Sequence, residues 1–219
     1  MKVFDENNFK AAIFDLDGTL IDSMHLWRRL LPDLLDKHGL KAPADMLRRV
    51  AFMTLTQSSE YVAEEFPQLS MTGREIREEW MGIIYEDYSK RIELKPGAKE
   101  LIETLKSQGV KLAVATACAK KLAEACLKNN GVRHLFDDVT YAEDIGCGKD
   151  TPGVYEECLR RLGCSADEAV LFEDILMAIK TAASIGLKTI AVEDETAASD
   201  REEIKKTAFG YIADFTEIL

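Results

Sequence analysis

The sequence lacks the features that mark several classes of protein. It has five cysteines, an odd number, and no C-x-x-C pair, which argues against a disulfide framework or a cysteine-based zinc site. Its three histidines show no metal-ligand spacing. The longest apolar run, Leu112 to Ala119, is far too short to cross a bilayer. No cysteine is followed six positions later by arginine, so cysteine-phosphatase chemistry is set aside.

Positive charge is also scarce relative to negative charge. The formal net charge is −11, which argues against nucleic acid or an anionic membrane as the main partner. The N-terminal stretch from Met1 to Lys10 is polar and acidic, so we expect no signal peptide and a cytoplasmic location with reduced thiols. The 219 residues are 47% hydrophobic and 31% charged, as in a soluble globular protein with one sizeable core or a core plus a small insert.

One stretch, Ala12 to Leu20, organises the rest of the chain. An apolar run, typical of a buried parallel strand, ends at Asp15, and Asp17 follows just before a Gly-Thr turn. Ligands of open α/β sheets gather at the carboxyl ends of such strands. Two carboxylates held this close favour a hard divalent cation between them, Mg²⁺ above all. The alternative is a strand end with two solvated aspartates.

The order of the elements indicates an α/β fold with a doubly wound parallel sheet. Residues 21–90 show helical periodicity and no convincing strand, whereas strands and helices alternate after Pro96. We therefore expect an α/β core over residues 1–20 and 93–219, and an inserted all-helical unit over 21–92. The strands are expected at Phe9–Phe14, Lys111–Thr116, Val139–Ala142, Ala169–Phe172 and Lys188–Val192, with an edge strand at Tyr211–Ile212.

Polar side chains also follow the other strands of the expected sheet. Thr116 ends one strand, Lys149 lies on a glycine-containing loop, and Glu173-Asp174 ends another strand. Taken singly, Thr116 is interpreted as a cap, Lys149 as a solvated charge on a loop, and Glu173-Asp174 as the N-cap of a helix. Together they supply what phosphoryl transfer requires: a carboxylate nucleophile, an acid/base, a metal site and fixed donors for the phosphoryl oxygens.

These residues, in this order and setting, resemble the four motifs of the haloacid dehalogenase-like superfamily, in its phosphatase and β-phosphoglucomutase-like branch. The resemblance covers nearly the whole chain and implies a Rossmann-like core with a helical cap. It implies that Asp15 is the nucleophile and Asp17 the general acid/base, and that Thr116 and Lys149 bind the phosphoryl group. Asp15, Asp17, Glu173 and Asp174 would form the Mg²⁺ site, Asp17 through its main-chain oxygen.

The sequence departs from the family pattern around the expected phosphate and metal sites. Ala117-Cys118 follows Thr116, where relatives carry small polar residues. Ile175 and Ala178 stand where relatives carry serine and glycine. We therefore hypothesise reduced, but not absent, turnover.

The resemblance leaves several activities to compare. The expected function is Mg²⁺-dependent hydrolysis of a small phosphorylated metabolite through an aspartyl phosphate. Dehalogenases and phosphonate-cleaving relatives lack an aspartate at position 17. Sugar phosphomutases carry a histidine at the position of Trp27, two residues from His25, so a mutase is the less favoured alternative. A protein that binds a phosphorylated metabolite without turning it over is the second alternative.

The identity of the substrate and the oligomeric state stay open at this stage. Polar side chains of the helical insert are candidate substrate contacts: His25, Arg28, Arg48, Arg49 and Thr54.

Overall fold

The computed structural model describes residues 9–43, 46, 49–50, 53 and 55–219. The chain forms two compact units, one made of Met1–Asp22 together with Ile92–Leu219, and the other of Ser23–Arg91. Arg48, Thr54 and most of residues 44–50, which belong to the expected all-helical insert, lie outside the described residues. No helix of the described part of the chain is long and apolar enough to cross a membrane.

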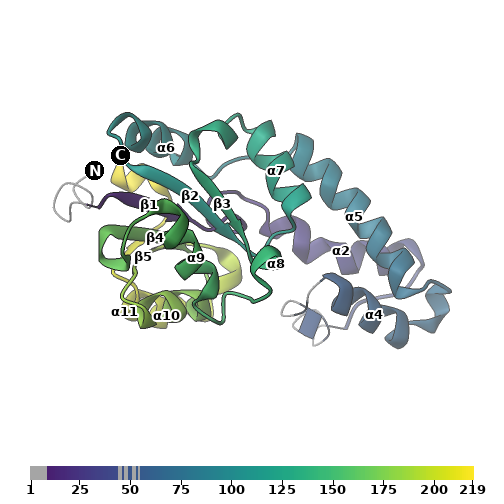
Figure 1. Cartoon of the computed structure of the whole chain (residues 1–219). Helices are drawn as coiled ribbons and strands as arrows, with labels where there is room; N and C mark the ends of the chain where they lie inside the picture. Colours follow the sequence, from purple (N-terminus) through teal and green to yellow (C-terminus); the bar gives the residue numbers. More distant parts are fainter. Residues whose placement is uncertain (1–8, 44–45, 47–48, 51–52, 54) are drawn as a thin grey trace. The chain divides into compact units, whose positions relative to one another are not determined.

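The first unit is built on a six-stranded sheet in the order β3-β2-β1-β4-β5-β6, with every neighbouring pair parallel (Figure 1). This confirms the predicted fold class. The central strand β1 is buried on both faces, as its unbroken apolar sequence requires. The strands are β1 (Ala11–Phe14), β2 (Lys111–Thr116), β3 (Asp138–Tyr141), β4 (Ala169–Glu173), β5 (Lys188–Val192) and β6 (Gly210–Ile212).

Helices cover both faces of this sheet (Figure 1). Ala11 and Ile13 of β1 pack in a cluster with small and aliphatic residues of α9 (Gly153–Leu162) and α10 (Leu176–Ser184). Successive strand residues point to opposite faces, so Phe14 lies on the other side. There its ring stacks on that of Phe172, with centroids 4.7 Å apart. The remaining helices of this unit are α6 (Ala98–Ser107), α7 (Lys120–Asn129), α8 (Ala142–Ile145) and α11 (Arg201–Thr207).

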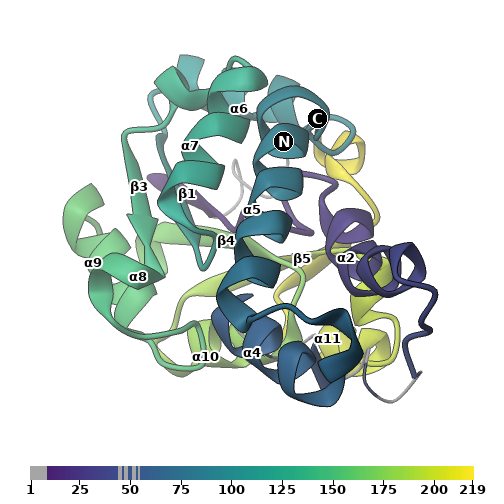
Figure 2. The same ribbon diagram turned by 90° about the vertical axis from the view of Figure 1, so that its right-hand side faces the viewer.

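The regular secondary structure of the second unit is helical in all of its described residues. Its helices are α2 (Met24–Lys37), α4 (Leu55–Glu65) and α5 (Gly73–Lys90), and α4 packs along α5 (Figure 2). Thr72 and Glu75 form a capping box at the start of α5, in which the Thr72 N–H donates to the Glu75 carboxylate at 2.8 Å. The buried Asp87 accepts hydrogen bonds from Arg29 at 2.7 Å and Arg91 at 2.6 Å, which compensates its burial.

The two chain segments that flank this insert pair with each other inside the first unit. Ile21 and Leu94 form an antiparallel bridge. The Asp22 N–H donates to the Glu93 carbonyl at 3.1 Å, and the Lys95 N–H donates to the Leu20 carbonyl at 2.9 Å. The insertion therefore begins and ends at one place, and the sheet is not interrupted by it.

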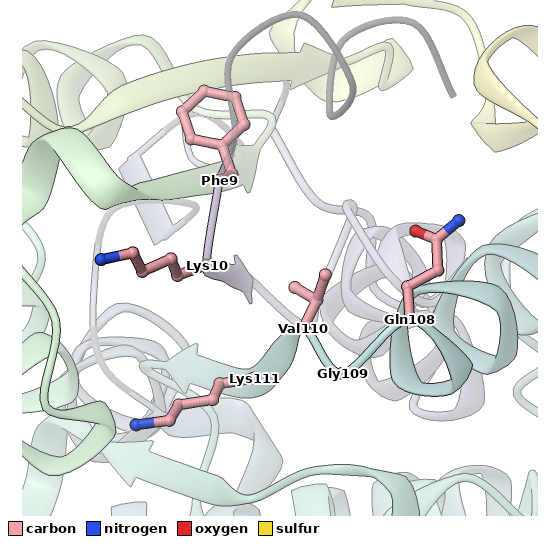
Figure 3. A pocket seen from close by; sticks show the side chains of 6 residues that line it. All are labelled: Phe9, Lys10, Gln108, Gly109, Val110 and Lys111. Atoms are coloured by element: carbon pink, nitrogen blue, oxygen red, sulfur yellow. The ribbon is translucent and has the colours of Figure 1, made fainter.

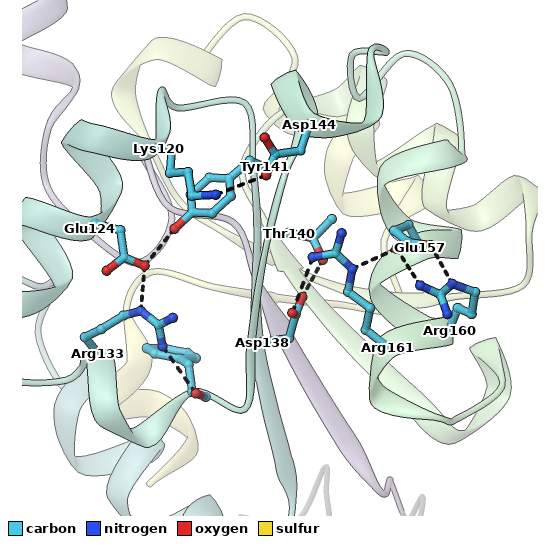
Figure 4. A network of polar contacts seen from close by, with 11 residues as sticks. Lys120, Glu124, Arg133, Asp138, Thr140, Tyr141, Asp144, Glu157, Arg160 and Arg161 are labelled. Carbon is cyan, nitrogen blue, oxygen red and sulfur yellow. Dashed lines mark hydrogen bonds and ion pairs between the residues drawn. The ribbon is translucent and has the colours of Figure 1, made fainter.

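The edge strand β3 is held by charged side chains from the helices to either side of it (Figure 4). Glu124 of α7 accepts hydrogen bonds from Arg133 at 2.7 Å and from the Tyr141 hydroxyl at 2.9 Å. Asp138 accepts one from Arg161 of α9 at 3.4 Å. These contacts tie a short edge strand to two helices.

The Glu124 contacts predict a pH-dependent contribution to stability. Burial by itself raises the pKa of Glu124, but hydrogen bonds from Arg133 and Tyr141 outweigh it and lower the pKa from 4.5 to about 2. Such a group stabilises the folded state above about pH 4.5, and this stabilisation is lost as the pH falls through about 2. We expect Glu124→Gln to lower the free energy of unfolding by about 1 kcal/mol at neutral pH, and by less in acid.

Urea unfolding near pH 7 and near pH 3 measures this difference. Glu103→Gln, at an exposed position of α6, is the matched control. A gap between wild type and Glu124→Gln that is equally large at both pH values would contradict the assignment.

Candidate active site

The hydrogen-bond ladder of the sheet places Asp15 at the carboxyl ends of the strands. Its N–H donates to the Phe172 carbonyl of β4 at 2.9 Å, which sets Asp15 beside the end of that strand. The chain then makes a tight turn, in which the Ile21 N–H donates to the Leu16 carbonyl at 3.0 Å. Gly18 has a φ of 79° in this turn, a conformation that glycine adopts without strain.

Three carboxylates and one ammonium group meet at this edge. Asp15, Glu173 and Asp174 are all buried, and one oxygen from each lies within 4.8 Å of the others. The Lys149 ammonium forms an ion pair with Asp15 and another with Glu173, the latter at 2.8 Å. Three separate parts of the chain thus contribute to one buried contact set, which consists of Asp15, Lys149, Glu173 and Asp174.

The charges in this cluster do not balance. Burial, followed by the neighbouring Glu173 carboxylate, raises the pKa of Asp15 to about 8. The same two causes raise the pKa of Asp174 well above its ordinary value. Burial opposes the charge on Lys149, but the carboxylates of Asp15 and Glu173 outweigh it and raise the pKa of Lys149. One lysine cannot neutralise three carboxylates, so the cluster favours an additional cation.

Asp174 supplies a specific place for that cation. Its Oδ1 accepts a hydrogen bond from the Thr19 hydroxyl at 2.7 Å, between two buried side chains. Its Oδ2 is buried and has no hydrogen-bond partner, one of few such atoms in the described part of the chain. A buried carboxylate oxygen without a partner is costly, and a metal ligand is one explanation for it.

Asp17 and Thr116 lie beside this cluster. Asp17 is half-buried on the turn, where its charge contributes to raising the pKa of Asp15. Thr116 is buried at the end of β2, and its hydroxyl accepts a hydrogen bond from the Cys118 N–H at 2.9 Å. Burial, followed by the charge of Asp17, raises the pKa of the Cys118 thiol, which is therefore held neutral.

A separate hollow of about 360 Å³ lies at the opposite, amino end of the strands (Figure 3). Its two lysines already have partners: Lys10 pairs with Glu168, and Lys111 donates to the Leu162 carbonyl at 2.5 Å. The hollow is lined by Phe9, Lys10, Gln108, Gly109, Val110 and Lys111. It contains no carboxylate among these lining residues and is distinct from the cluster at the carboxyl edge.

Comparison with known proteins identifies the family of this chain. The model of the haloacid dehalogenase-like hydrolase family matches residues 12–192, most of the chain. The chain belongs to this family. The match confirms the resemblance that the sequence motifs predict.

Curated relatives of this haloacid dehalogenase-like hydrolase include two phosphatases. It is 26% identical over 184 residues to the phosphorylated carbohydrates phosphatase of Thermotoga maritima, covering 83% of each chain. It is 28% identical over 214 residues to the validoxylamine A 7'-phosphate phosphatase of Streptomyces hygroscopicus subsp. limoneus, covering 96% of each chain.

Solved structures support the same fold. CbbY from Rhodobacter sphaeroides, in complex with phosphate, superposes with a TM-score of 0.75 and 23% identity over 96% of each chain. At this level of identity the likeness shows a shared fold.

The donor set of the cluster suits a hard divalent cation. It offers carboxylate oxygens, which Mg²⁺ and similar ions prefer, and no thiolate or imidazole ligand. Asp15 and the unpartnered Oδ2 of Asp174 are the acceptors available to it. The residues therefore fit a divalent metal, although they do not by themselves select Mg²⁺.

The structure brings together Asp15, Lys149, Glu173 and Asp174, as the sequence motifs suggested, with Asp17 and Thr116 next to them. The chemical roles of these residues stay predictions. Sequence reasoning missed two further contacts of the cluster. Thr19 had a signal, since it lies in the same turn as Asp17. Tyr155, whose hydroxyl contacts Glu173, had no such signal in the sequence, because its spacing in the helix is that of an ordinary core residue.

The Thr19 contact predicts a loss of metal affinity on substitution. Thr19→Val keeps the shape of the side chain but removes the donor that orients Asp174. Partners of metal ligands typically contribute ~10- to 100-fold to affinity, so we expect the Kd for Mg²⁺ to rise about tenfold. Isothermal titration calorimetry of the full chain measures it.

Thr140→Val is the matched control, because this buried threonine also donates to an aspartate, Asp138 at 2.6 Å, in the edge strand β3. Equal Mg²⁺ affinities for Thr19→Val and wild type would show that Thr19 does not orient the metal site.

Proposed function

We propose that this chain is a Mg²⁺-dependent phosphatase that hydrolyses a phosphate monoester of a small metabolite through an aspartyl phosphate on Asp15. The observation that carries the proposal is the buried contact set of Asp15, Lys149, Glu173 and Asp174 at the carboxyl edge of the sheet. Membership of a hydrolase family supports it, as do the phosphatase names of the two curated relatives described above. A cytoplasmic location is part of the same proposal.

In the first half-reaction, a carboxylate oxygen of Asp15 attacks the phosphorus of the substrate. The bond between phosphorus and the ester oxygen breaks, and Asp17 protonates the departing oxygen. The ammonium of Lys149 and the hydroxyl of Thr116 hold the non-bridging phosphoryl oxygens, where negative charge is concentrated in the transition state. The product of this step is an acyl phosphate on Asp15.

In the second half-reaction, Asp17 takes a proton from water, and the oxygen of that water attacks the phosphorus of the acyl phosphate. Inorganic phosphate leaves and the Asp15 carboxylate is restored. Asp17 thus returns to its starting state, and a group acting in this way is typically worth ~10²- to 10⁴-fold in rate. The half-buried position of Asp17, beside the fully enclosed Asp15, suits an exchange of protons with substrate and water.

Asp15, Asp174 and the main-chain oxygen of Asp17 would hold Mg²⁺, with Glu173 beside them. When bound, the ion would supply positive charge that offsets the repulsion between the Asp15 carboxylate and the phosphoryl group.

The names of the curated relatives support a proposal for the substrate class. One of these relatives is named for phosphorylated carbohydrates and the other for validoxylamine A 7'-phosphate. A phosphorylated sugar or a similar polar metabolite is therefore the preferred substrate. His25, Arg28 and Arg49 of the helical unit stay predicted substrate contacts.

A sugar phosphomutase is not favoured. Trp27 occupies the position at which mutases carry histidine, and its indole N–H donates to the Tyr88 hydroxyl at 2.9 Å within the helical unit. No imidazole is present at that position to replace it.

The proposal predicts that Asp15→Asn abolishes phosphate release. The variant keeps the shape of the side chain but removes the nucleophile, so we expect kcat/KM to fall at least ~10³-fold. Release of phosphate from p-nitrophenyl phosphate, hexose phosphates and a nucleoside monophosphate, each with Mg²⁺ and with a chelator, measures the activity.

Asp144→Asn, on an exposed aspartate of α8, should leave the activity unchanged. Equal phosphate release by wild type and Asp15→Asn would reject the enzyme and favour a non-catalytic binding protein. Turnover of wild type at the rate of ordinary phosphatases would instead refute the reduced turnover expected from Ala117, Cys118, Ile175 and Ala178.

A further inference from the structure

Glu173 has every acceptor position of its carboxylate occupied by a protein donor. Its Oε1 accepts hydrogen bonds from the N–H groups of Asp174 at 3.1 Å and Ile175 at 3.2 Å. Its Oε2 accepts one from the Lys149 ammonium at 2.8 Å and one from the Tyr155 hydroxyl at 3.3 Å. A carboxylate offers about four lone-pair positions, so this fully buried group has none left for a metal ion.

Asp174, the next residue, shows the opposite arrangement. Its Oδ1 has the Thr19 hydroxyl as a partner, and its Oδ2 has none. The two neighbouring carboxylates therefore differ in their free acceptor positions. Asp174 has an oxygen available to a cation, whereas the oxygens of Glu173 accept hydrogen bonds from Lys149 and from the start of the following loop.

The fourth donor of Glu173 comes from a helix that packs on the face of the sheet to which Leu171 points. Tyr155 lies on α9 and is fully buried, and its ring belongs to the cluster that includes Ile13 and Leu171. The ring of Tyr155 packs among apolar side chains, and its hydroxyl donates a hydrogen bond to the Glu173 carboxylate. Packing of the ring thus fixes the position of the hydroxyl, and the hydroxyl in turn limits rotation of the Glu173 carboxylate.

We propose that Tyr155 is a positioning residue for the reaction: by filling the last acceptor position of Glu173, it keeps that carboxylate oriented toward the Lys149 ammonium, which binds phosphate. The inference rests on the proposed function for the role of Lys149. Tyr155 itself touches neither the metal nor the substrate in this account. Without its hydroxyl, Glu173 has a free acceptor position and Lys149 is held less accurately.

The test uses the full chain with Tyr155→Phe, Glu173→Gln and the double variant. Binding of inorganic phosphate in the presence of Mg²⁺, and of Mg²⁺ alone, is measured by calorimetry, and KM and kcat are measured with p-nitrophenyl phosphate. Because a hydrogen bond to a charged group is lost, we expect Tyr155→Phe to raise the phosphate Kd and KM about fivefold or more. The Kd for Mg²⁺ alone should change less than about twofold, since Glu173 is not a metal ligand in this account.

The double variant separates positioning from a merely structural role. If Tyr155 acts through Glu173, Tyr155→Phe has no further effect on phosphate binding in the Glu173→Gln background. The same effect in both backgrounds would overturn the proposal, as would no effect in either. A rise in the Mg²⁺ Kd as large as the rise in the phosphate Kd would also overturn it, because Glu173 would then act on the metal.

Two controls complete the experiment. Tyr211→Phe, on the edge strand β6, removes another tyrosine hydroxyl that is hydrogen-bonded to a glutamate, Glu193, and should change neither Kd. Should Tyr155→Phe fail to fold, Glu173→Gln tests the premise on which the role of Tyr155 depends: an unchanged phosphate Kd, or a Mg²⁺ Kd that rises as much as the phosphate Kd, would overturn the proposal. Failure of the proposed function shows separately, as equal activity of wild type and Asp15→Asn.

Discussion

The burial of three carboxylates against a single ammonium group is the constraint on which this site depends. Asp15, Glu173 and Asp174 are enclosed at the carboxyl ends of β1 and β4, and Lys149 pairs with two of them. Removing charges from water is unfavourable unless partners compensate them. The fold provides those partners for Glu173 and leaves part of the charge of Asp15 and Asp174 for a cation and a phosphoryl group.

The sheet makes this arrangement possible because it is rigid close to the site. β1 and β4 are bonded in register, and both are buried on both faces, so the ends of these strands have little freedom to move apart. The chain leaves the sheet after Asp15 through a tight turn and returns beside the same turn, at Leu94 and Lys95. A complete helical unit is therefore inserted without disturbing the hydrogen bonds that position the nucleophile.

The sequence predicted the strands, their parallel arrangement and the acidic edge to within a few residues. Apolar runs such as Ala11–Phe14 and Ala169–Glu173 are local signals, and polar residues directly after them mark the carboxyl edge. The candidate residues Asp15, Lys149, Glu173 and Asp174 were recognisable for that reason. The different surroundings of Glu173 and Asp174 were not, because the two residues are adjacent and chemically alike.

The sequence by itself thus determined the class of fold, the family and the edge of the sheet at which the candidate site lies. Short segments encode these features, because strand and helix periodicities and the Asp15–Thr19 turn are local patterns. The tertiary structure alone decided how the acceptor positions of each carboxylate are filled. The side-chain donors to these two groups are Thr19, Lys149 and Tyr155, which lie 155, 24 and 18 positions along the chain from the carboxylate that each contacts, and folding of the sheet and α9 brings them to the same edge. Hydrogen bonds between distant elements depend on positions in space, and no local pattern specifies them.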